Sequence, residues 1–170
     1  LKIAEIIPAI VVGSTTSRVT GSQFMDKAKF GMSDVLKRSL TDRWMMGVYG
    51  VESQQFPFII FTTDFFQNAF AGMLKWEESM PDDLARIFNY IEKARVNDDT
   101  STTSIASYYG IRGTFRDRVV RNRDVREFLS NNVEILFLYS FIDKDSLVLA
   151  TCGATLGAFV NGIEKQAFVK

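Results

Sequence analysis

The sequence predicts an α+β fold, a single domain with a mostly antiparallel sheet and helices packed on it. Runs of β-branched and aromatic residues occur near the N-terminus, before residue 64 and after residue 113, which is typical of strands. Segments with apolar residues at three- and four-residue spacing lie between them and predict helices. Short polar turns join several strand-like runs, which favours antiparallel pairing. With 170 residues, 46% of them hydrophobic, the chain can bury one core, and we expect residues 1–170 to form one domain.

The N-terminal segment predicts a strand, a turn and a helix. Residues 3–12 are largely β-branched, and Pro8 within them suits an edge strand. Residues 13–21 (GSTTSRVTG) have turn composition. Ser22 is expected to cap a helix that runs to about Leu40, weakened midway by a glycine. The apolar stripe of this helix comprises Phe24, Ala28, Met32, Val35, Leu36 and Leu40.

The middle of the chain predicts a hairpin followed by two helices. Residues 44–51 and 56–63 read as its strands, with a longer loop over 52–55. Asp64 and Gln67 have the spacing of a capping box and predict the start of the first helix. Its predicted buried face is Phe66, Ala69, Phe70, Met73 and Leu74. Pro81 lies early in the second helix, whose buried face is expected to be Leu84, Ile87, Phe88 and Ile91.

The C-terminal part predicts four strands and a helix. A kinked helix pair over residues 65–93 is followed by a polar stretch at 97–107 (NDDTSTTSIAS), which we expect to be a flexible surface loop. The strands are predicted at 114–120, 124–129, 133–142 and 147–151, with a turn over 143–146. The third of them is almost continuously apolar and should be central and covered on both faces. The tail at 153–164 predicts a short amphipathic helix.

Composition limits the chemistry that the chain can support. Histidine is absent and Cys152 is the single cysteine, so the commonest general base, an internal disulfide and cysteine-based zinc sites are excluded. We expect Cys152 to be a small buried residue. Twenty basic and twenty acidic residues balance, so we expect no nucleic-acid partner. The sequence contains no run of about eighteen apolar residues, which is the length that a helix needs to span a bilayer. We expect no catalytic set, no metal site and no cofactor.

One charged segment is a candidate binding surface. Six arginines fall between residues 112 and 126, and the candidate binding residues are Arg116, Arg118, Arg121, Arg123, Asp124 and Arg126. In a strand, Arg116 and Arg118 share one face and could bind phosphate or a carboxylate-bearing partner. The favoured interpretation is an edge strand defended by charge, with Asp117 and Asp124 pairing locally. No aromatic residues lie between these arginines, as they would in a protein that binds single-stranded nucleic acid. We expect Asn122, Asp124 and Arg126 to form a local polar brace.

Three segments carry a resemblance to a known family. They read RWMMGVYGVESQQFPFIIFTTDFFQNAFAGMLKWEESMPDDLARIF, TFRDRVVRNRDVR and ILFLYSFIDKDSLVLAT. Residues 40–151 resemble a family of uncharacterised, membrane-anchored proteins predicted from genomes of candidate-phylum bacteria. The signature positions present are Pro57, Phe58, Phe66, Gln67, Ala69, Phe70, Gly72, Met73, Trp76, Glu77, Asp83, Leu84, Phe115, Asp117, Asn122, Asp124 and Arg126. The chain departs from the family at Cys152, Gly153 and Ala154, where a polar helix start is usual.

The resemblance implies a membrane anchor before Leu1 and a domain displayed at the membrane surface, outside the cytoplasm. The family has no assigned activity, so no catalytic residue follows from it. The leading hypothesis is a non-enzymatic interaction or assembly module, membrane-tethered in its full-length form, with a protein partner. The alternative is an enzyme acting on a phosphorylated or sugar substrate through Asp117, Asp124 and Arg126. Adjacent acids such as Glu77 and Glu78 point in different directions and are not expected to converge on a site.

Overall fold

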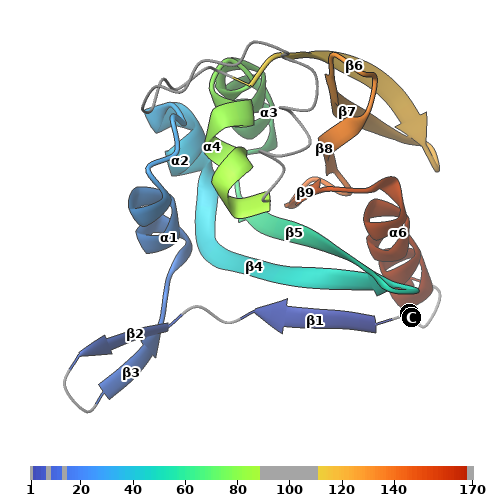
Figure 1. Cartoon of the computed structure of the whole chain (residues 1–170). Helices are drawn as coiled ribbons and strands as arrows, with labels where there is room; N and C mark the ends of the chain where they lie inside the picture. The colour runs from blue at the N-terminus through green and yellow to red at the C-terminus, as the bar shows by residue number, and fades with distance from the viewer. Residues whose placement is uncertain (1, 7–8, 13–14, 89–110, 168–170) are drawn as a thin grey trace, which may run out of the picture.

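The computed structural model describes residues 2–6, 9–12, 15–88 and 111–167. Within these ranges, seven strands form one sheet in which every neighbouring pair is antiparallel (Figure 1). From one edge to the other, the strands are β1 (Lys2–Ile6), β4 (Leu40–Val51), β5 (Gln54–Thr63), β9 (Ser146–Ala150), β8 (Ile135–Phe141), β7 (Arg123–Ser130) and β6 (Gly113–Val120). The predicted α+β class with an antiparallel sheet is confirmed. The loop predicted at 97–107 lies outside the described residues.

The N-terminal segment is divided between two sheets. The edge strand β1 pairs with β4, whereas β2 (Ala9–Val12) and β3 (Thr15–Arg18) form a separate hairpin. The prediction of a turn over residues 13–21 is therefore wrong at Thr15–Arg18, which form the second strand of this hairpin. Its sequence, TTSR, has no apolar face, so periodicity could not reveal a strand that is specified by pairing with β2.

The single helix predicted from Ser22 to Leu40 is two helices, α1 (Gly21–Ala28) and α2 (Asp34–Ser39). Thr20, rather than Ser22, caps α1, in a capping box with Gln23. The chain leaves α1 through Lys29 in the left-handed region, with φ of 53°. Near Gly31 the chain passes so close to Ser79 that an added Cβ would lie 2.4 Å from its Oγ. The helix therefore ends at Lys29, and the chain that follows makes a long-range contact that a local sequence pattern does not contain.

The central hairpin has a shorter connection than expected, and the following helix buries a different face from the predicted one. β4 and β5 pair as far as Val51 and Gln54, so the connection has two residues rather than a longer loop. Asp64 does not cap α3 (Phe66–Trp76), which begins after Phe65 without a side-chain cap. Its buried face is Ala69, Gly72, Met73 and Trp76. The predicted core positions Phe66, Phe70 and Leu74 are 38, 46 and 43% exposed.

The rotation of α3 follows from its contact with α2. A Cβ on Gly72 would lie 2.7 Å from the Cβ of Leu36, so the two helices approach closely at this glycine. This contact turns the phenylalanines of α3 outward. The second helix, α4 (Met80–Phe88), buries Leu84 and Phe88 as predicted, whereas Ile87 is partly exposed and the predicted Ile91 lies outside the described residues. Asp83 in its first turn accepts hydrogen bonds from the Trp76 indole at 2.6 Å and the Gly31 amide at 2.7 Å.

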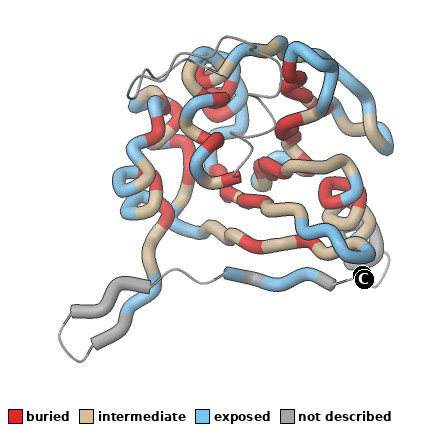
Figure 2. The backbone as a smooth tube through the Cα atoms, viewed as in Figure 1, coloured by how far each residue is buried: buried red, intermediate tan, exposed pale blue. Residues whose placement is uncertain are grey.

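Two apolar clusters cover the two faces of the sheet. One joins the sheet to α1, α2, α3 and α4, and the other joins it to α6 (Gly153–Ala167), which supplies Leu156 and Val160 (Figure 1). The interior of β8 is fully buried, so the predicted central strand is confirmed. Burial falls towards the β6 edge, where most residues are exposed (Figure 2). Cys152, expected to be buried, is partly exposed at the end of β9, with its sulfur 3.2 Å from the Thr155 hydroxyl.

Candidate binding surface

The arginine-rich segment forms the β6–β7 hairpin at one edge of the sheet. Its register runs unbroken from Gly113 opposite Ser130 to Val120 opposite Arg123. Because side chains alternate between faces along a strand, this register separates the candidate residues. Arg116, Arg118 and Arg123 belong to the face covered by α6, whereas Asp124 and Arg126 belong to the face covered by the other helices. The structure therefore brings together only part of the predicted set.

On the α6 side, one buried carboxylate holds two arginines. Glu127 is 1% exposed, and it accepts hydrogen bonds from Arg116 Nη2 at 2.7 Å and from Arg118 Nη1 at 3.0 Å. Each oxygen of the carboxylate takes one guanidinium. The two arginine side chains are still 49 and 54% exposed. A guanidinium has five N–H donors, so each arginine keeps donors for a ligand while its position is fixed from below.

The remaining two arginines of this side lie at the hairpin turn. Arg121 and Asn122 both have positive φ, 52° and 57°, which is the geometry of a two-residue hairpin turn. Arg121 donates to the Asn161 side chain on α6. Arg123 has no ion-pair partner within the described part of the chain. We call Arg116, Arg118, Arg121 and Arg123 the arginine face; among the residues that the structure describes, Glu127 is the one carboxylate that forms ion pairs with it.

On the opposite side, Arg126 is part of a closed network. Its Nε and Nη2 donate to the two oxygens of Glu77 at 2.8 and 2.6 Å, and its Nη1 donates to Asp117 at 3.0 Å. The Tyr139 hydroxyl also donates to Glu77, at 2.6 Å. The guanidinium carbon lies 5.3 Å from the centre of the Phe115 ring, a cation–π contact. These contacts fasten the end of α3 to the sheet.

The electrostatics of this network agree with its geometry. The hydrogen bond to Glu77 raises the pKa of Arg126 above its usual value. Burial raises the pKa of the Tyr139 phenol, and the hydrogen bond to Glu77 adds to that shift. Both groups therefore keep their protons in the folded protein. The expected brace of Asn122, Asp124 and Arg126 does not form: Arg126 bonds Glu77 and Asp117 instead, and Asp124 is exposed.

Two participants were missed by the sequence analysis. Glu77 is 49 residues from Arg126, so that pairing has no short-range spacing. Glu127 is 11 residues from Arg116 across the hairpin, but it lies in a mostly buried strand where a charged residue was not expected. The sequence contained a signal for Glu127. Side-chain alternation along the hairpin places Glu127 on the same face as Arg116, and a buried carboxylate there would need a cation. No such signal existed for Glu77.

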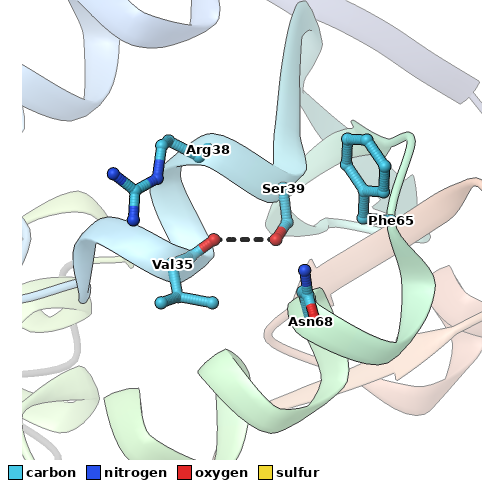
Figure 3. A pocket seen from close by; sticks show the side chains of 5 residues that line it. All are labelled: Val35, Arg38, Ser39, Phe65 and Asn68. Atoms are coloured by element: carbon cyan, nitrogen blue, oxygen red, sulfur yellow. Dashed lines mark hydrogen bonds between the residues drawn. The ribbon is translucent and has the colours of Figure 1, made fainter.

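A third exposed feature is aromatic. Phe66 and Phe70 of α3 lie against Phe141 of β8, with ring centres 5.0 and 6.2 Å from it. Near the start of α3, Phe65 is 61% exposed. It borders an open pocket of about 230 Å³ between α2 and α3, together with Val35, Arg38, Ser39 and Asn68 (Figure 3). The Ser39 hydroxyl donates to the Val35 carbonyl at 2.7 Å, so its proton is already engaged.

Comparison with known proteins adds no family. No protein-family model matches the chain, and no curated protein or solved structure matches it either. Among the described residues, no helix has the length and apolar character needed to cross a membrane. The same residues contain no group of three or more Cys, Asp or Glu side chains placed to hold a metal ion.

Proposed function

We propose that this domain is a non-enzymatic interaction module that binds an acidic segment of a partner protein on the arginine face. The observation that carries the proposal is Glu127, a buried carboxylate that positions two half-exposed guanidiniums. One arginine could satisfy both oxygens of this carboxylate, as Arg126 does for Glu77. The second arginine therefore adds positive charge that the fold does not need. Arginine held in a fixed position suits a bidentate contact with a carboxylate.

Defence of the sheet edge is the competing interpretation of the same residues. It requires only charged side chains that are costly to desolvate, and solvated arginines would suffice. It does not require a buried carboxylate beneath them, which is costly to bury and needs pairing in its turn. The anchored arrangement is typical of a site that is ordered before its ligand arrives, which lowers the entropy cost of binding.

The enzymatic alternative has less support. A substrate site built from Asp117, Asp124 and Arg126 would need these groups to converge in a sheltered pocket. Asp117 is 84% exposed, Asp124 is exposed, and Arg126 is engaged by Glu77. Turnover of a phosphate ester or a glycoside that is lost in an Asp117→Asn variant would favour the enzyme.

Membrane tethering and display outside the cytoplasm are also part of the proposal. Both are supported only by the resemblance of residues 40–151 to membrane-anchored proteins. The gene sequence that precedes the codon of Leu1 tests them: a predicted membrane span there supports the tether, and an uninterrupted second soluble domain would count against it.

Binding of a fluorescein-labelled decaglutamate peptide tests the arginine face. The double variant Arg118→Ala, Arg123→Ala removes two cations but leaves Glu127 paired with Arg116. We expect its affinity to fall by about tenfold or more, with a smaller dependence of affinity on salt. The matched control, Arg38→Ala with Arg43→Ala, removes the same charge from exposed positions outside the face. Equal losses in the two double variants, or no binding by the parent, would overturn the proposal.

A further inference from the structure

We infer that the partner segment binds as an extra β-strand along β6, with acidic residues at alternate positions. This inference rests on the proposed function and specifies how its ligand is held. An edge strand offers a row of free backbone N–H and C=O groups, and many peptide-binding domains use such an edge. The arginine face lies along this edge, so one extended segment could contact the backbone and the guanidiniums together.

β6 has few of the features that usually protect an edge. Among the described residues it pairs only with β7, and its eight residues pair without a bulge. It contains no proline, and most of its residues are exposed (Figure 2). The other edge strand, β1, has five residues, and a short edge strand is itself a protective feature. Within the described part of the chain, charge is the one protective feature of β6, and on the α6 side its charged residues are the cations Arg116 and Arg118, which would attract an acidic strand.

The hairpin geometry identifies the free backbone groups. In a hairpin with a two-residue turn, the closing pair exchanges both backbone hydrogen bonds, and the next pair exchanges none. The closing pair is Val120 and Arg123. The N–H and C=O groups of Val119, Asp117 and Phe115 therefore point away from β7. A strand added along β6 would bond to these three residues.

The side chains next to this edge define the sequence that fits. Residues two apart on a strand lie about 6.8 Å apart on one face, so acids at alternate positions would meet Arg116 and Arg118. The residue between those acids would lie on the other face beside Asp117, which favours a cation. Its next neighbour on that face would meet Val119, which is 65% exposed and favours an apolar contact. The peptide TVEKEVT satisfies these preferences in either strand direction.

A second copy of the chain fits this edge less well. Two β6 strands paired edge to edge would bring the arginines of both copies next to each other, and like charges at that distance repel. An acidic partner removes this repulsion.

Peptide binding measured by fluorescence anisotropy tests the inference. We expect TVEKEVT to bind about tenfold more tightly than TVEEKVT, which has the same composition but places its acids on opposite faces. The variant Val119→Pro removes one outward N–H without removing a bond to β7, and we expect it to lose this preference. Circular dichroism of the variant checks that the sheet is retained.

Each outcome decides between the two proposals. Equal binding of both peptides, unchanged by Val119→Pro but weakened by Arg118→Ala with Arg123→Ala, would overturn strand addition and leave the arginine face standing. No binding of either peptide or of decaglutamate would overturn both. Dimers of the parent chain that dissociate in Val119→Pro would assign the edge to a second copy and overturn the inference.

Discussion

Two glutamates on opposite faces of the same sheet hold arginines of the β6–β7 hairpin in different ways. Glu77 takes two donors from one arginine and a third from Tyr139, and Arg126 is only 25% exposed. Glu127 divides its oxygens between two arginines that remain half exposed. The first arrangement is closed and uses its charges within the fold. The second keeps guanidinium donors in solvent, so neighbouring arginines in one short segment have different roles.

Stability measurements can test whether Glu127 needs both of its arginines. Replacing Arg118 by alanine leaves Arg116 to pair with the carboxylate, and we expect a loss of less than about 1 kcal/mol in the free energy of unfolding. Replacing both Arg116 and Arg118 leaves a buried charge without a partner, and we expect a loss of about 3 kcal/mol or more. Urea denaturation followed by circular dichroism measures both.

The two single variants and the double variant form a cycle whose coupling is the informative quantity. If the double variant loses only as much free energy of unfolding as the two single variants together, neither arginine can replace the other. In that case Glu127 would need both arginines, and neither would be surplus to the fold. The pair Arg38→Ala, Arg43→Ala should change stability by about 0.5 kcal/mol or less, since both side chains are exposed.

The closed network makes a smaller prediction that depends on pH. Tyr139→Phe removes one hydrogen bond to Glu77 and should cost about 1 kcal/mol at neutral pH. Because the folded protein raises the pKa of this phenol, its stabilising effect is complete below the unfolded pKa of about 10 and declines as pH rises above it. The stability gap between the parent and the variant should therefore narrow between about pH 10 and 11. Urea denaturation at pH 7 and across that interval measures the gap, and a constant gap would contradict the closed network.

Much of the sheet could be predicted because its signals are local. β8 is a nearly continuous apolar run, β4 and β5 are β-rich segments joined by polar residues, and the period of two places Arg116 and Arg118 on one face. The errors arose where distant residues decide the local structure. Gly31 approaches Ser79, and Gly72 accommodates Leu36, so one predicted helix is broken and another is rotated.

The arginines of the candidate surface could be predicted from the sequence, but their ion-pair partners could not all be predicted. The arginines are evident in the sequence, and their division between two faces follows from the register of the hairpin. Glu77 is not evident as a partner, because it comes from the end of α3, and although Glu127 shares a face with Arg116, its burial depends on packing across the sheet. Which arginine is bound inward and which is available is therefore information that only the tertiary structure contains.

The arginine side chains can be followed directly during binding. In ¹⁵N spectra of the arginine Nε–H groups, titration with decaglutamate should shift the resonances of Arg116 and Arg118. The Arg126 Nε–H donates to Glu77, which also accepts from Tyr139, so its resonance should stay in place and exchange slowly with water. Shifts confined to Arg126, or equal shifts of all three, would contradict the division between a closed network and an open arginine face.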